Sequence, residues 1–374
     1  MRHGWRRRLA TAAAVAVAAA AGAGLALGTR GGGPADAPRP RAVSAVLPVP
    51  EAEAAARLFL VGFGGTRGDD PSVRRLGLRD WGGVVIEPHN ARSPRQVRAL
   101  VRSIRADAAG WGSAQPPLVA IRQPGGPGSA LPSLPPPAQP DQAVPREARH
   151  AARSAGRALR ALGVELTLGA PVADLAAVGG PAAERGFSAD PQTASELVAA
   201  AVEGYREAGL ASAPGSFPGE GGASQDPVDG PATVGMSREE LAARDLAPFR
   251  AAVAAGAPAM LVSDAIYAAW DDAGPAALAP EAYDLLRRGA GFGGVAISGD
   301  LNAATAVTGG SVAEAAVAAL RAGADLLWVP GDATEQESAY RAVLAALRAD
   351  PVVRARAAEA LGRVALLRER YALP

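Results

Sequence analysis

Short apolar runs alternate with longer amphipathic stretches through most of the chain. The runs span residues 58–63, 83–87, 118–122, 164–170, 210–213, 259–263, 295–298 and 326–329. Such nearly continuous hydrophobicity over a few residues is typical of parallel strands that are covered on both faces. The stretches between them, such as 94–105, 147–162, 191–208 and 238–255, have the spacing of helices with one apolar face.

Eight strands that alternate with helices predict a (β/α)8 TIM-type barrel over residues 51–374. A doubly wound parallel sheet is the alternative architecture for the same pattern. The proline-rich stretch 124–145 predicts an irregular connection after the third strand, and loops of this length are functional or disordered. The final stretch, 335–370, predicts one or two closing helices with a break near Asp350 and Pro351.

The N-terminus has the composition of an export signal. Four of the first eight residues are arginine, and residues 9–27 are apolar and uncharged. We therefore predict a signal peptide or membrane anchor over residues 1–28, followed by a flexible linker rich in Gly, Pro and Ala over residues 29–50. The barrel is expected to be extracellular, or anchored on the outer face of the membrane through this segment alone.

The charge balance and the missing cysteines narrow the possible functions. The chain has 38 basic residues, all arginine, and 37 acidic residues, and no polybasic cluster suggests a nucleic-acid partner. Without cysteine there are no disulfides and no thiolate chemistry. The histidines, His3, His89 and His150, lack metal-ligand spacing. We expect no metal, no cofactor and a monomeric barrel.

The stretch 215–226 is a Gly- and Pro-rich segment after the fifth apolar run, as expected of a loop that carries function. Its residues Phe217, Pro218, Gly219, Gly221 and Asp226 match a loop of glycoside hydrolase family 3. The chain resembles this family, and most closely its single-domain β-N-acetylhexosaminidases. The resemblance implies a TIM barrel that acts on amino-sugar glycans at the C-terminal ends of its strands.

Further motifs of the family follow the other strands in the expected order. The matching segments are residues 122–126, 170–174, 184–191, 260–267, 298–301 and 322–325. Together they extend the resemblance over residues 57–373. The last segment, which ends at Asp325, is structural in the family.

The residues that carry the chemistry of the family are replaced. The nucleophile position is Gly299, and the position of the acid/base histidine is Val228. The sugar-binding lysine and histidine positions are Gly215 and Ser216, and a sugar-binding aspartate position is Arg122. A glycine has no side chain to attack a sugar, and a valine carries no proton. The resemblance therefore implies a family member whose catalytic groups are missing.

Two substrate-binding positions of the family are retained, as Asp174 and Arg185. A structural alternative is that Arg185 pairs with Asp174 and holds the loop. Asp264 stands where the family has another histidine.

Three hypotheses follow from this pattern. The first is an exported, catalytically impaired barrel that binds a glycan or a protein partner. The second is an active hydrolase with re-sited carboxylates, in which Asp300 is the nucleophile and Glu220 or Asp226 is the acid. The third is a structural barrel without a ligand. Adjacent side chains on a strand point to opposite faces, so Asp300 would not replace a side chain at 299 unless the strand end bulges.

Overall fold

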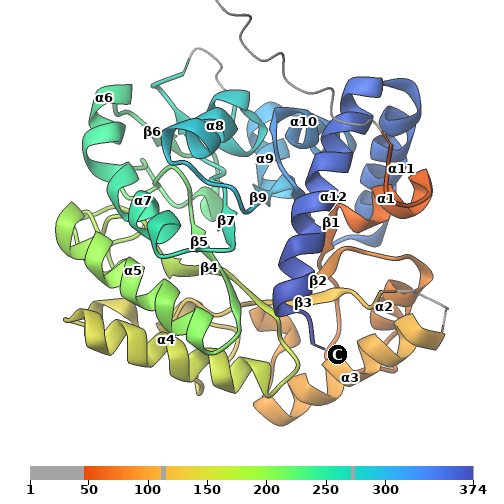
Figure 1. The fold of residues 1–374 in the computed structure, drawn as a ribbon, viewed down its shortest axis with the longest axis horizontal. Helices are drawn as coiled ribbons and strands as arrows, with labels where there is room; N and C mark the ends of the chain where they lie inside the picture. Colours follow the sequence, from red (N-terminus) through yellow and green to blue (C-terminus); the bar gives the residue numbers. More distant parts are fainter. Residues whose placement is uncertain (1–45, 111–114, 271–273, 374) are drawn as a thin grey trace, which may run out of the picture. The chain divides into compact units, whose positions relative to one another are not determined.

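The computed structural model describes residues 46–110, 115–270 and 274–373, which form a nearly closed barrel of eight parallel strands (Figure 1). The strand order is β5-β4-β3-β2-β1-β10-β9-β7. The strands are β1 Phe59–Val61, β2 Gly83–Ile86, β3 Leu118–Arg122, β4 Leu166–Val172, β5 Ala211–Gly215, β7 Ala259–Leu261, β9 Val295–Asp300 and β10 Leu326–Val329. A separate parallel pair joins β6 Thr233–Val234 to β8 Ile266–Tyr267.

The barrel closes between the segments that follow β5 and β7. The Phe217 amide donates to the Leu261 carbonyl, and the Ser263 amide donates to the Phe217 carbonyl, each at 2.8 Å. This bridge joins the two ends of the strand order, so the predicted (β/α)8 barrel is confirmed and the doubly wound sheet is not formed.

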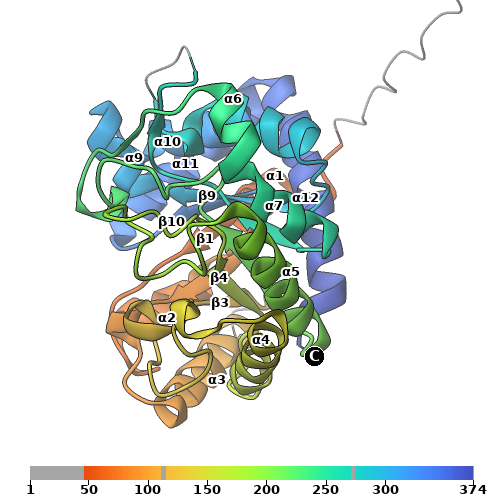
Figure 2. The same cartoon turned by 90° about the vertical axis from the view of Figure 1, so that its left-hand side faces the viewer.

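Helices surround the strands on the outside (Figures 1 and 2). They are α1 Glu51–Arg57, α2 Pro71–Arg74, α3 Pro94–Gly110, α4 Pro145–Arg160, α5 Pro191–Glu207, α6 Arg238–Glu240, α7 Leu246–Ala254, α8 Pro280–Asp284, α9 Leu301–Thr308, α10 Val312–Ala322, α11 Ala333–Ala349 and α12 Pro351–Tyr371. Several begin with proline directly after an acidic cap. Asp190, for example, accepts a hydrogen bond from the Thr193 amide at the start of α5.

The interior of the barrel is filled by side chains from alternate strand positions and from α12. Val364, Leu367 and Tyr371 of α12 pack with the inward-facing residues of the strands. Arg368 of the same helix donates to the Gly82 carbonyl, just before β2. Helix α12 therefore covers the N-terminal end of the barrel and leaves the opposite end for a site. The predicted break in the C-terminal stretch falls at Asp350, which caps α12.

Two buried glutamines fix the proline-rich connection after β3. Gln123 exchanges two hydrogen bonds with the backbone of Leu131, and Gln139 does the same with Val172 at the end of β4. Amide side chains can satisfy a backbone donor and acceptor together, which explains how an irregular segment is held against the barrel.

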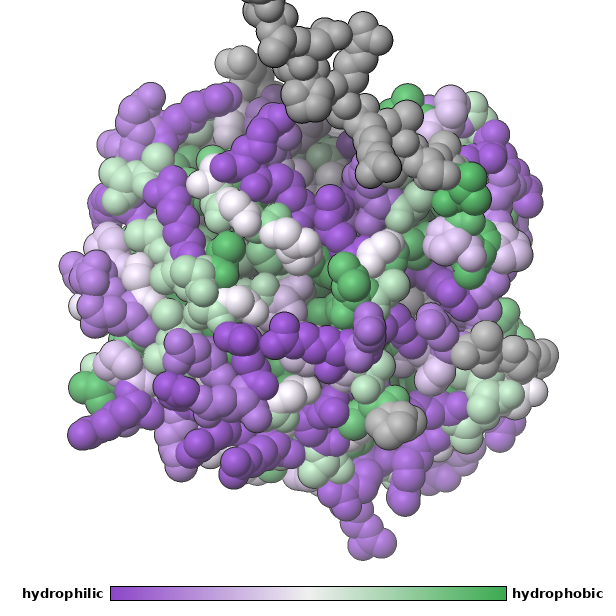
Figure 3. All heavy atoms as spheres, in the orientation of Figure 1, coloured by the Kyte–Doolittle hydropathy of each residue, from purple (hydrophilic) through white to green (hydrophobic). Residues whose placement is uncertain are grey.

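The predicted signal or anchor, and the predicted linker up to residue 45, lie outside the described residues. Within the described part, no single helix is both long and apolar enough to cross a membrane, although α9 and α10, bent by 105° relative to each other, meet the length and composition criteria together. Hydrophilic residues are spread over the face shown in Figure 3, between small apolar areas.

Candidate active site

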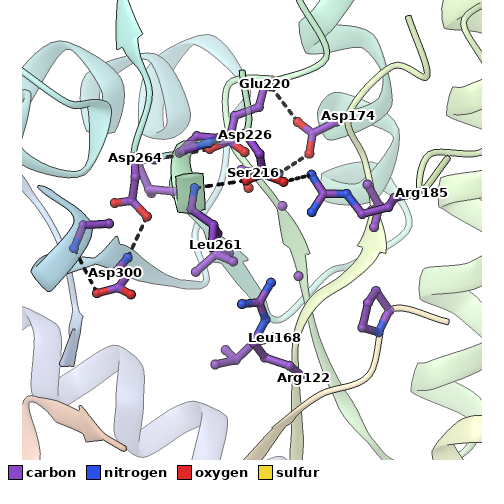
Figure 4. A pocket seen from close by; sticks show the side chains of 18 of the residues that line it. Arg122, Leu168, Asp174, Arg185, Ser216, Glu220, Asp226, Leu261, Asp264 and Asp300 are labelled. Atoms are coloured by element: carbon purple, nitrogen blue, oxygen red, sulfur yellow. Dashed lines mark hydrogen bonds and ion pairs between the residues drawn. The ribbon is translucent and has the colours of Figure 1, made fainter. Parts of the chain in front are cut away.

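A cavity of about 320 Å³ opens at the C-terminal ends of the strands. Residues at or just beyond the ends of β3, β4, β5, β7, β9 and β10 line it (Figure 4). All of the site residues that the sequence predicted line this cavity, namely Asp174, Arg185, Glu220, Asp226 and Asp300. Arg122, Asp264 and Trp328 line it as well.

Asp174 holds the loop that follows β5. Its side chain lies just beyond β4 and is 5% exposed. One carboxylate oxygen accepts a hydrogen bond from the Ser216 amide at 2.9 Å, and the other accepts one from the Glu220 amide at 2.7 Å. Burial raises the pKa of Asp174 to about 6, against the opposing effect of these two hydrogen bonds. Through these two hydrogen bonds, Asp174 positions the loop at residues 216–220 that follows β5.

Arg185 pairs with Asp226 across the cavity wall. The distance from Nη2 to Oδ2 is 2.8 Å, and the Arg185 Nε also donates to the Pro181 carbonyl at 3.1 Å. The ion-pair partner of Arg185 is thus Asp226 and not Asp174, the partner named by the structural alternative. Asp226 also caps the turn at 227–229 by accepting from the Val228 amide. Val228 itself is 74% exposed and brings no titratable group to the position of the acid/base residue.

Glu220 is a buried carboxyl group whose surroundings favour its protonated form. Its residue is 7% exposed, and it accepts a hydrogen bond from the Asp264 amide at 3.3 Å. Burial first, and then the charge of Asp174, raise the pKa of Glu220 to about 8. The raised pKa suits Glu220 to the role of a general acid.

The carboxyl group of Asp264 occupies the space that a side chain at position 299 would need. A Cβ atom built on Gly299 would lie 2.5 Å from Asp264 Oδ2 and closer still to its Cγ and Oδ1. Oδ2 accepts a hydrogen bond from the Asp300 amide at 2.8 Å, and Oδ1 is buried without a partner. Burial, followed by the charges of Asp300 and Glu220, raises the pKa of Asp264 well above its usual range.

No pattern in the sequence predicted this arrangement. Position 264 marked only a replaced histidine, and the two residues lie on different strand ends, 35 positions apart. The parallel pairing of β7 with β9 brings the two strand ends next to each other.

Asp300 lines the cavity at the end of β9, where the strand is irregular. Leu326 of β10 pairs with Ile297, but Trp328 pairs with Asp300, so the register shifts by one residue between them. Strict alternation predicts that Asp300 points away from the cavity, yet Asp300 lines it, next to this register shift. The Asp300 carboxylate accepts hydrogen bonds from the Asn302 and Ala303 amides at 2.8 and 3.2 Å and so caps α9. Burial raises its pKa.

Among the described residues, no group of three or more His, Cys, Asp or Glu side chains is arranged to hold a metal ion. The chemical capacity of the cavity therefore rests on its carboxyl groups, its two arginines and the indole of Trp328.

Comparisons with known proteins agree with this geometry. The model of the glycosyl hydrolase family 3 N-terminal domain matches residues 70–367. A β-hexosaminidase of Stenotrophomonas maltophilia is 34% identical over 270 residues, which cover 67% of this chain and 78% of that protein. One of Thiobacillus denitrificans is 35% identical over 283 residues, which cover 71% and 76%.

Solved structures give the same result. A family 3 β-N-acetylglucosaminidase from Paenibacillus sp. superposes with a TM-score of 0.80 at 30% identity, covering 86% of this chain and 62% of that one. A β-N-acetylhexosaminidase from Beutenbergia cavernae superposes with a TM-score of 0.74 at 28% identity, covering 85% and 98%.

Proposed function

The chain belongs to glycosyl hydrolase family 3, and from that premise we propose that it is an exported barrel that binds an amino-sugar glycan without hydrolysing it. The observation that carries this proposal is the pair formed by Gly299 and Asp264. The nucleophile position has no side chain, and the carboxyl group that fills its space is one whose pKa is strongly raised.

Retaining hydrolysis needs an ionised carboxylate that attacks the sugar and an acid that protonates the leaving group. Attack on the sugar needs the ionised form, because protonation removes the negative charge that makes a carboxylate nucleophilic. Asp264 also lies beside Glu220 and Asp300, so its ionisation would place another negative charge among carboxyl groups. This environment opposes the ionised form that the chemistry requires.

The cavity nevertheless keeps groups that suit a sugar. Asp174 holds the loop in place, and the Arg185–Asp226 pair presents a fixed donor and acceptor on the cavity wall. Glu220 supplies a further hydroxyl-like donor when it is protonated. A cavity with several convergent polar groups on a rigid barrel is typical of a binding site, which favours the glycan over a structural role without a ligand.

A second candidate function rests on one specific observation. Asp300 and Glu220 line the same cavity, and Glu220 has the raised pKa of a general acid. An active hydrolase with Asp300 as the nucleophile is the rival reading. Against it, both hydrogen bonds to the Asp300 carboxylate come from the first turn of α9, toward which Figure 4 shows it turned.

Turnover of an aryl N-acetylglucosaminide separates the two functions. We expect no release of the aryl group by the wild-type protein, and no difference in the Asp300→Asn and Glu220→Gln variants. The same sugar without the aryl group should bind to all three proteins in calorimetry. Turnover by the wild type that disappears in Asp300→Asn would show that the carboxylates were re-sited and would overturn the proposal.

Export is a separate part of the proposal, motivated by the arginine-rich start and the uncharged run at residues 9–27. We expect cell fractionation to find the barrel in the extracellular or membrane fraction. Deletion of residues 1–28 should retain it in the cytoplasm. Finding the full-length chain in the cytoplasmic fraction would contradict this prediction.

A further inference from the structure

We propose that Arg122 binds the carboxylate of an acidic sugar in the cavity. This inference rests on the proposed function, because it names the class of sugar that the same site takes. Arg122 faces the cavity at the end of β3, at the position where the family pattern has a sugar-binding aspartate.

Arg122 has free donors, unlike the other charged groups of the cavity. Its guanidinium makes no hydrogen bond and no ion pair with any residue in the described part of the chain, and its one close partner is the ring of Trp328. Each of the others has a hydrogen bond or an ion pair: Asp174, Arg185, Glu220, Asp226, Asp264 and Asp300. A guanidinium has five N–H donors in a fixed plane, so an unpaired one facing a cavity has full capacity for an anionic ligand.

The surroundings hold Arg122 in place without using its donors. Its Cζ lies 5.8 Å from the centre of the Trp328 ring, within the range of a cation–π contact. Figure 4 shows the guanidinium in the cavity, between the side chains of Leu168 and Leu261. Apolar neighbours cannot compete for the N–H groups, so the planar fork remains available.

Trp328 offers an independent sign of a polar ligand. It is 5% exposed, lines the cavity, and its Nε1 has no hydrogen-bond partner. A buried indole N–H usually finds an acceptor, and a sugar hydroxyl or carboxylate would supply one.

The charge of the cavity favours a carboxylate over a phosphate. Asp264 and Asp300 lie close enough to Arg122 for its positive charge to oppose the rise in their pKa values. A dianionic phosphate on Arg122 would meet these carboxyl groups, whereas a carboxylate brings a single charge. A carboxylate also matches the guanidinium fork in a planar, bidentate pair.

Uronic acids and amino sugars with a lactyl ether both carry such a group. Calorimetry on the full-length chain with matched ligands tests both. N-acetylmuramic acid is compared with N-acetylglucosamine, and methyl β-glucuronide is compared with methyl β-glucoside. In one pair or the other, we expect the acid to bind at least about tenfold more tightly than its neutral partner.

The variants assign the preference to one side chain. Arg122→Gln should bind both members of the pair equally, while Arg122→Lys should keep part of the preference because the charge remains without the fork. Arg185→Gln is the matched control, since its guanidinium is paired with Asp226, and it should weaken both members by the same factor. Thermal unfolding of each variant checks that the barrel is intact.

The outcomes separate this inference from the proposed function. If the neutral sugars bind and the acids have no advantage, or if the advantage survives in Arg122→Gln, the inference is wrong and the proposed function stands. If none of the sugars binds, both are wrong. Tighter binding of N-acetylglucosamine 6-phosphate than of either acid would overturn the assignment to a carboxylate.

Discussion

Replacing Gly299 with aspartate, the residue that the family pattern has there, is expected to destabilise the protein without restoring hydrolysis. The new Cβ would overlap the carboxyl group of Asp264. Asp264 could rotate away only by giving up the hydrogen bond from the Asp300 amide, which would leave a partly buried donor without a partner. Overpacking of this kind costs about 1–3 kcal/mol of unfolding free energy.

Hydrolysis should remain absent because the other groups stay missing. Val228 still carries no proton at the acid/base position, and Gly215 still provides no cation for the sugar. The measurement is urea unfolding together with turnover of the aryl N-acetylglucosaminide. Activity gained by Gly299→Asp alone would show that Asp264 does not block the site.

A double variant tests whether the side chains at positions 299 and 264 compete for the same space. Adding Asp264→His removes the overlapping carboxyl group and places the family residue at position 264. We expect Gly299→Asp with Asp264→His to be more stable than Gly299→Asp alone, with a coupling between the two sites of about 0.5–3 kcal/mol. Additive effects of the two substitutions would mean that the two positions do not compete for the same space.

The Asp325→Asn substitution is expected to lower the free energy of unfolding by about 3–5 kcal/mol, the largest effect that we predict. Asp325 is completely buried at the start of β10. Its carboxylate pairs with Arg287 at 2.6 Å, with Arg363 at 3.0 Å and with Arg356, and it accepts from the Ala296 amide at 2.9 Å. The neutral amide would leave three guanidinium groups around a buried position with no negative charge.

Urea unfolding measures this effect, and an exposed pair provides the control. Asp69 pairs with Arg67 at 2.7 Å on the surface, so Asp69→Asn should change stability little because water screens the two charges. Asp325→Asn should leave the binding of sugars to the folded protein unchanged, since position 325 lies at the other end of the barrel from the cavity. An Asp325→Asn variant as stable as Asp69→Asn would refute the structural role.

The sequence by itself determined the barrel, and through the resemblance it predicted that the catalytic groups of the family are replaced. Eight apolar runs specify eight strands, because a strand covered on both faces needs apolar side chains at every position. Such a run consists of consecutive residues, so it can be recognised in the sequence without knowledge of the fold. The identity of a residue also settles some chemistry outright. Glycine at 299 cannot attack a sugar, and valine at 228 cannot hold a proton, in any fold.

Only the tertiary structure decided what the retained groups do. Asp300 lines the cavity while its carboxylate caps α9, and the partner of Arg185 is Asp226. Asp264 fills the space next to Gly299, and the guanidinium of Arg122 contacts the ring of Trp328. These facts depend on how loops from different strands meet at the mouth of a closed barrel. Side chains far apart in the chain come within hydrogen-bond distance there, and their burial shifts their pKa values. No local pattern in the sequence could have specified these contacts or these pKa shifts.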